Sequence, residues 1–352
     1  MRSIITFFTV VAAGCAVFSS PIRPTVDERD TAITGPGAAY DLGVIYRGGI
    51  EVTLDVDKAR TYFKQAAEDN HPPALTALGD LLQETAPLPK PYLEIASYYH
   101  EAALLGEPRA MFRMGRLASY VLPEKASIKS PFEWFLAAHR SGYADAAQEI
   151  GKIYEQRGDY KEAYFYYLKA SDAGNSEAKL ALSDFYTFGR GVSMNQEKGF
   201  VYLSEAAESG NVVACLNFGN RLKKKGLYFD LIEAGRWYAT ASQKKMKAAR
   251  DTLEIERRQC LDRTVRVEER ATSCVIAAAT NDPAVLFTLS ALLRADQPSP
   301  AHAREAHKWA LKSAELGFEP ARRLVMNDLK LGYGTPIDMV AYKGWESVRP
   351  SD

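Results

Sequence analysis

The sequence contains little cysteine or histidine and has no excess of charge of either sign. Four cysteines in 352 residues are too few for a small domain held by many disulfides. The 44 basic residues balance the 44 acidic ones, which argues against nucleic acid as the main partner. No apolar run reaches the ~20 residues of a membrane-spanning helix. With 47% hydrophobic and 25% charged residues, the chain has the composition of a folded globular protein.

Motifs for catalysis and for metal binding are also missing. The sequence has no Gly-x-Ser-x-Gly elbow, no Walker-type phosphate loop and no His-Glu-x-x-His pair. His302 and His307 are five residues apart in the sequence, whereas two ligands on one helix face need a spacing of three or four. We therefore expect no catalytic residue, no cofactor, no metal site and no enzyme activity.

Residues 1–15 have the composition of an export signal. A basic Arg2 precedes an apolar stretch over residues 4–11, and small residues then lead to Cys15. The tetrapeptide Ala-Ala-Gly-Cys resembles the lipobox of bacterial lipoproteins, which implies a lipid on Cys15 as the sole membrane anchor. The alternative is simple secretion with cleavage after Ala16. Either reading places the protein outside the cytoplasm, in the periplasm, on the outer membrane or in the medium.

Beyond the signal, aromatic residues recur at a nearly constant interval. Residues 16–37, with several Pro, Gly and Ser, are expected to form a flexible tether before this repeating region. Intervals of 32–36 residues separate neighbouring aromatics, with one double step, in the series Tyr62, Tyr98, Trp134, Tyr166, Tyr202, Trp237, Trp309 and Trp345. A fixed period of this length predicts a solenoid, here of about nine units.

Each unit carries the marks of two helices joined by a turn. The first helix contains a hydrophobic–Gly pair, as in Leu78-Gly79. Glycine inside a helix costs about 1 kcal/mol relative to alanine, so its recurrence predicts the close approach of a second helix. That second helix carries two large residues and then two small ones, as in Tyr98-Tyr99 before Ala102-Ala103. Side-chain caps are expected at Asp55, Asp159, Asn195, Asp230 and Asp338.

The combined pattern resembles the Sel1-like repeat, and residues 178–210 match it best. The resemblance implies an all-α fold, an α/α solenoid of about nine Sel1-like helix-turn-helix repeats over residues 38–349. The fourth unit, residues 146–174, is closer to a tetratricopeptide repeat. The seventh unit departs most, because it lacks the aromatic, the Leu-Gly pair and the glycine turn.

Two further features could carry function. Cys260 and Cys274 flank the expected turn of the seventh unit and form either a disulfide or two free thiols. Residues 221–270 contain 14 Lys and Arg but only 8 Asp and Glu. Six lysines concentrate this excess, namely Lys223, Lys224, Lys225, Lys244, Lys245 and Lys247. They form either a patch for an acidic partner, an anionic glycan or a lipid head group, or a solvated surface.

The repeat array and the signal favour a non-enzymatic scaffold, adaptor or regulator in the bacterial envelope. Such a scaffold is expected to bind one or more proteins along the concave face of the solenoid. By resemblance to a few cysteine-rich relatives, the alternative is a protein that binds cell-wall glycan or β-lactam, with at most weak hydrolase activity. No nucleic acid is expected as a partner.

Overall fold

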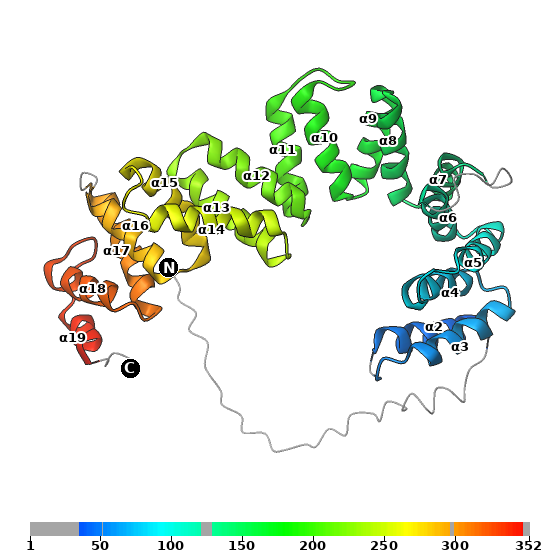
Figure 1. Cartoon of the computed structure of the whole chain (residues 1–352), viewed down its shortest axis with the longest axis horizontal. Coiled ribbons are helices and arrows are strands. Elements are labelled where there is room, and N and C mark those ends of the chain that lie inside the picture. The colour runs from blue at the N-terminus through cyan, green and yellow to red at the C-terminus, as the bar shows by residue number, and fades with distance from the viewer. Residues whose placement is uncertain (1–34, 51, 121–128, 296–298, 348–352) are drawn as a thin grey trace, which may run out of the picture. The chain divides into compact units, whose positions relative to one another are not determined.

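A computed structural model describes residues 35–50, 52–120, 129–295 and 299–347. In these ranges the chain forms 18 α-helices and one short 3-10 helix, with no strand. Consecutive helices pair into nine hairpins, as Figure 1 shows. The predicted all-α solenoid of about nine helix-turn-helix units is therefore confirmed. The export signal, Cys15 and residues 16–34 of the predicted tether lie outside the described residues.

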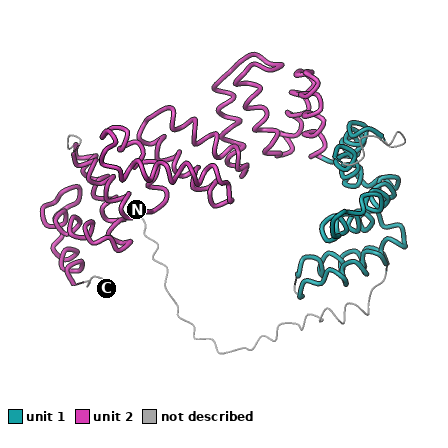
Figure 2. The backbone as a smooth tube through the Cα atoms, viewed as in Figure 1, with its two compact units in different colours: residues 1–143 teal, residues 144–352 magenta. Residues whose placement is uncertain are grey.

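The chain divides into two compact units, coloured separately in Figure 2. Unit 1 ends at Tyr143 and contains three hairpins. The first helix begins at Pro36, within the stretch predicted as a tether. The helices of unit 1 are α2 (Pro36–Gly48), α3 (Val56–Glu68), α4 (Pro72–Thr85), α5 (Tyr92–Leu104), α6 (Pro108–Tyr120) and α7 (Pro131–Arg140).

Unit 2 begins at Ala144 and contains six hairpins. Its first four helices are α8 (Asp145–Arg157), α9 (Tyr160–Asp172), α10 (Ser176–Phe188) and α11 (Gln196–Glu208). The next four are α12 (Val212–Lys225), α13 (Tyr228–Gln243), α14 (Lys247–Leu261) and α15 (Val267–Ala277), followed by the 3-10 helix η1 (Ala278–Thr280). The last four are α16 (Pro283–Ala295), α17 (Pro300–Glu315), α18 (Glu319–Leu331) and α19 (Met339–Ser347).

The recurring glycine of the first helix packs against a ring of the second helix. In the second hairpin, a Cβ added to Gly79 would lie 2.5 Å from Cε1 of Tyr99. Four other hairpins repeat this contact, in the pairs Gly43–Phe63, Gly115–Phe135, Gly151–Tyr167 and Gly219–Tyr238. All five rings are buried. The predicted close approach is thus confirmed, and the partner is the second residue of each large-residue pair.

Two hairpins that lack this glycine also lack the facing ring. In the fifth hairpin, Ser183 stands at the glycine position and Leu203 at the ring position. In the eighth, Ser290 stands opposite Ala310, and both are buried, as are Ser183 and Leu203. A larger residue on the first helix thus accompanies a smaller one on the second, which keeps the hairpin closely packed.

The first residue of the large-residue pair has a separate role. In three hairpins it stacks on a tyrosine that lies three residues after the glycine position. The ring centroids are 5.6 Å apart in each of the pairs Tyr46–Tyr62, Tyr154–Tyr166 and Tyr186–Tyr202. The two neighbouring large residues therefore make different contacts. The second packs inside the hairpin, and the first stacks on a tyrosine along its edge.

Small residues allow successive hairpins to stack. Ala74 at the start of α4 packs with Ala66 at the end of α3 and with Ala39 in α2, and all three are buried. Alanines in the position of Ala66 are fully buried in six further hairpins, at Ala102, Ala138, Ala170, Ala206, Ala241 and Ala277. Ala38 corresponds to Ala74 in the repeat but is exposed, because no described hairpin precedes α2.

Three of the five predicted caps accept backbone hydrogen bonds. Asp55 accepts from the amides of residues 57 and 58, Asn195 from that of residue 198, and Asp338 from those of residues 340 and 341. Asp159 precedes α9 without a side-chain cap bond. The prediction for Asp230 is wrong, because α13 begins two residues earlier, at Tyr228.

The ring-on-glycine contact predicts opposite effects for two glycine substitutions. Gly79→Ala should lower the free energy of unfolding by about 1–2 kcal/mol, because the clash with Tyr99 outweighs the better helix propensity of alanine. Gly37→Ala, whose Cβ meets nothing within 4 Å, should be neutral or slightly stabilising. Urea unfolding followed by circular dichroism measures both. Equal midpoints for the two variants would contradict the packing argument.

Candidate interaction surfaces

The structure separates the six lysines into two groups. Lys223, Lys224 and Lys225 end α12, beside the start of α13. The other three lie at the opposite end of α13, since Lys244 and Lys245 follow it and Lys247 begins α14. A helix of 16 residues is about 24 Å long at the rise of an α-helix. The six lysines therefore do not form a single patch.

Three of these lysines contact residues of neighbouring hairpins, and a fourth has a left-handed backbone conformation. Lys223 forms an ion pair with Glu256, whose side chain is buried in α14. Lys225 lies 4.4 Å from the centre of the Phe200 ring, and Lys244 donates to the carbonyl of Gly210 at 2.7 Å. Lys245 adopts φ 65° at the position where other hairpins have glycine or asparagine. Binding of an anionic partner by these lysines stays a prediction.

Buried carboxylates join neighbouring helices elsewhere. In unit 1, Asp80 of α4 lies 2.6 Å from Arg109 and 2.9 Å from Arg113, and it accepts from the Tyr99 hydroxyl at 2.8 Å. Burial, then the charge of Asp80, raises the pKa of Tyr99 well above its usual value. Asp80 and Arg113 also line a cavity of about 430 Å³. The acid thus connects α4, α5 and α6.

Asp328 plays the same part near the end of unit 2. It lies 2.5 Å from Arg294 of α16 and 2.8 Å from Nδ1 of His307 in α17. His307 therefore faces a carboxylate between hairpins. Within the part of the chain that the structure describes, no group of three His, Cys, Asp or Glu side chains could hold a metal ion.

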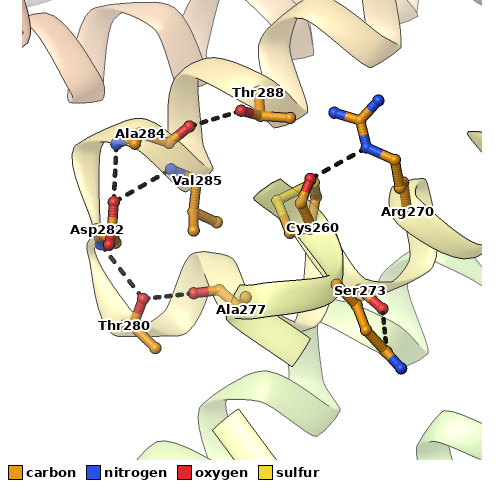
Figure 3. The surroundings of a disulfide bond; sticks show 11 residues. Cys260, Arg270, Ser273, Ala277, Thr280, Asp282, Ala284, Val285 and Thr288 are labelled. Carbon is orange, nitrogen blue, oxygen red and sulfur yellow. Dashed lines mark hydrogen bonds between the residues drawn. A yellow bond between two sulfur atoms is a disulfide. The ribbon is translucent and has the colours of Figure 1, made fainter. Parts of the chain in front are cut away.

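A disulfide links the two helices of the seventh hairpin (Figure 3). Cys260 lies in the last turn of α14 and Cys274 in the second turn of α15, with their Cα atoms 4.7 Å apart. Nε of Arg270 donates to the carbonyl of Cys260 at 3.1 Å, and Ser273 donates to Gln259 at 3.0 Å. One covalent bond and two hydrogen bonds thus hold α15 against α14.

The disulfide stands where the other hairpins have their packed second residue. Cys274 is 36 residues after Tyr238 and 36 before Ala310 (274 − 238 and 310 − 274). The helix that contains it has 11 residues and continues directly into the 3-10 helix η1 at Ala278. The seventh hairpin is therefore closed by a covalent bond at the position of the ring.

An apolar groove of about 640 Å³ is lined in part by α15. Its lining comes from the first turns of α13, from α15, from the second half of α16 and from the first turns of α17. Leu231, Val275 and Leu289 are buried lining residues, whereas Phe229 at the start of α13 is 79% exposed. This groove was not predicted from the sequence, although the loss of the repeat pattern in the seventh unit marks the region.

A hydrogen bond between α17 and α13 fixes one wall of the groove. Nε1 of Trp309 in α17 donates to the hydroxyl of Tyr228 in α13 at 3.0 Å. The two residues are 81 positions apart in the sequence. Burial raises the pKa of the Tyr228 hydroxyl, although the bond from Trp309 acts in the opposite direction. The sixth and eighth hairpins thus meet directly at this point.

A family model described as Sel1 repeat matches residues 36–71, 135–175, 176–211 and 301–318. This chain carries Sel1-like repeats. A crystal structure of a Sel1 repeat protein from Oxalobacter formigenes is similar, with a TM-score of 0.56 and 28% identity, over 61% of this chain and 90% of that one. The family matches leave out residues 212–300, which include the helices α14 and α15.

Two curated proteins are similar to parts of this Sel1-like chain. Chitin synthase regulatory factor 3 of Schizosaccharomyces pombe is 24% identical over 235 residues, which cover 62% of this chain and 25% of that protein. An uncharacterized protein of Neisseria meningitidis serogroup B is 28% identical over 191 residues, covering 53% and 32%. The chain spans a quarter to a third of the length of these relatives.

Removal of the disulfide should loosen the seventh hairpin. The Cys260→Ala/Cys274→Ala variant should lose about 3 kcal/mol of unfolding free energy, because the bond closes a loop with a sequence separation of 14. Urea midpoints with and without dithiothreitol measure this loss. The reductant should lower the midpoint of the wild type and leave that of the double variant unchanged. An unaffected wild type would show that the bond adds no stability.

Proposed function

We propose that this chain is a non-enzymatic scaffold that binds a protein segment in the apolar groove around α15, and that it acts in the bacterial envelope. Sel1 repeat proteins are generally scaffolds for protein–protein interaction. Solenoids suit this task because stacked hairpins present long, regular surfaces. The printed name of the yeast relative, a regulatory factor, supports a role exerted on another protein.

The groove is the observation that carries the proposal. Its floor is aliphatic, and the Phe229 ring at its edge is 79% exposed. Leaving such a surface in water costs free energy, and exposed apolar patches with polar rims mark sites of interaction. Val267 of α15 is 58% exposed as well, so part of the apolar lining is open to solvent.

The proposed location in the bacterial envelope is based on the sequence of residues 1–15. A basic residue, an apolar stretch and a small-residue segment that ends at Cys15 support export and lipid attachment. A lipid on Cys15 would place the repeats near a membrane surface without a spanning helix. Among the described helices, none is both long and apolar enough to cross a bilayer.

Photo-crosslinking in living cells tests the groove as the binding site. Phe229→p-benzoylphenylalanine should give a discrete covalent adduct with one protein, identified by mass spectrometry. The matched control is Phe188→p-benzoylphenylalanine, because Phe188 is 64% exposed at the end of α10, away from the groove. Identical adducts at both positions, or none at position 229, would refute binding in the groove.

Substitution of Cys15 tests the proposed lipid attachment and location in the envelope. In a Gram-negative host grown with labelled palmitate, the wild type should take up label and sediment with membranes. Cys15→Ala should remove the label and move the protein to the soluble periplasmic fraction, because the attachment atom is missing. Cys215→Ala, which changes a buried free thiol, serves as the control. Unlabelled wild-type protein in the soluble fraction would favour simple secretion.

A further inference from the structure

We propose that the groove takes an amphipathic helix of a partner protein, and that Glu268 and Glu305 select a basic side chain on that helix. This inference rests on the proposed scaffold function, because it defines the chemistry of the partner at the same site. Three properties of the groove support it, namely its apolar stripes, its charges and its architecture.

The apolar stripes fit a helix better than an extended strand. On α15, residues Val267, Ala271 and Val275 follow one another at intervals of four and line the groove. On α16, Leu289, Leu292 and Leu293 line it at intervals of three and four. Two helical stripes therefore face one apolar space. A third helix enters such a space with side chains at the same spacing, in the mode of helix-in-groove recognition.

The charges of the groove have one sign. Glu268 of α15 and Glu305 of α17 line it from different helices, and the described lining includes no Lys or Arg. The Glu268 carboxylate forms no ion pair or hydrogen bond with another described residue, and Glu305 reaches Lys308 only at 3.9 Å. His302 is the remaining titratable side chain on the rim besides Tyr228. The two acids are thus available to a cation on the occupant.

This arrangement discriminates between classes of partner. A helix with an apolar face and one Lys or Arg can pack its apolar face on the floor of the groove and pair its cation with the two carboxylates. An acidic helix, or an anionic lipid surface, would bring like charges together at the rim. The groove therefore favours a cationic amphipathic segment, in contrast to the anionic partners that the lysine-rich sequence suggested.

The groove also has firm walls. The disulfide Cys260–Cys274 holds α15, and the Trp309–Tyr228 hydrogen bond holds α17 against α13. In α13, a Cβ added to Gly235 would lie 2.3 Å from the carbonyl oxygen of Ile276, so the end of α15 lies directly on α13. A site whose walls are fixed before binding loses less entropy when the partner docks.

Fluorescence anisotropy with defined peptides tests the proposal on the full chain. The probes are fluorescein-labelled 14-residue helices with Leu or Phe at positions i, i+4 and i+7, and with one Lys or one Gln beside this stripe. The Lys peptide should bind the wild type about tenfold more tightly than the Gln peptide, since two rim ion pairs of ordinary strength give that ratio. The preference should fall in 0.5 M salt.

Two charge-matched variants isolate the rim acids. Glu268→Gln/Glu305→Gln should abolish the preference for the Lys peptide and still bind both peptides. Glu315→Gln/Glu346→Gln removes the same charge from exposed positions outside the groove and should retain the preference. Circular dichroism melting shows whether both variants keep the wild-type fold. Equal affinity of the two peptides for the wild type would overturn the charge selection and leave the scaffold proposal intact.

If neither peptide binds, the proposal that the groove takes a helix is wrong. The crosslink at position 229 then decides separately whether the groove binds any protein. A partner that crosslinks at position 229 while neither helix binds would mean a scaffold with a different kind of occupant. If neither peptide binds and no crosslink forms at position 229, the proposed function itself is refuted.

Discussion

The contact of a buried ring with a glycine is the interaction on which the repeat depends. It sets the distance between the two helices of a hairpin, because an aromatic side chain lies where the facing helix has no Cβ. The fully buried alanines one turn further on then allow the next hairpin to approach. Where serine replaces the glycine, as at Ser183 and Ser290, a smaller residue replaces the ring. The packing volume is therefore maintained even when the residues change.

In the seventh hairpin, a covalent bond between the two helices takes the place of the contact between ring and glycine. With Cys274 at the ring position, the disulfide to Cys260 supplies the connection between the helices. A bond of this kind needs no large side chain, so it can close a hairpin that lacks the ring. The same hairpin contributes α15 to the apolar groove, which α13, α16 and α17 also line. The departure from the repeat and the proposed binding site thus lie in the same hairpin.

Buried charges connect helices that pack side by side. Asp80 and Asp328 are buried and bind basic side chains from neighbouring helices, and Lys223 does the same for Glu256. A buried acid without such partners would be strongly destabilising, so each pair also specifies which helices meet. Glu268 and Glu305 differ because they are not buried pairs of this kind: they line a groove whose described lining contains no Lys or Arg, and Glu305 reaches only the exposed Lys308, at 3.9 Å. This contrast separates structural charges from charges available to a partner.

The sequence by itself determined the repeat, its period, the helix pairs and the glycine contact, because these depend on residues at fixed local spacing. It predicted the caps at Asp55 and Asn195 correctly but placed one at Asp230, since a shift of the helix start by two residues cannot be read from the local pattern. Only the tertiary structure decided that the lysine triplets lie at opposite ends of α13. It alone brought Tyr228 to Trp309, 81 residues away, and so formed the groove. Such contacts depend on how hairpins stack, which local patterns do not encode.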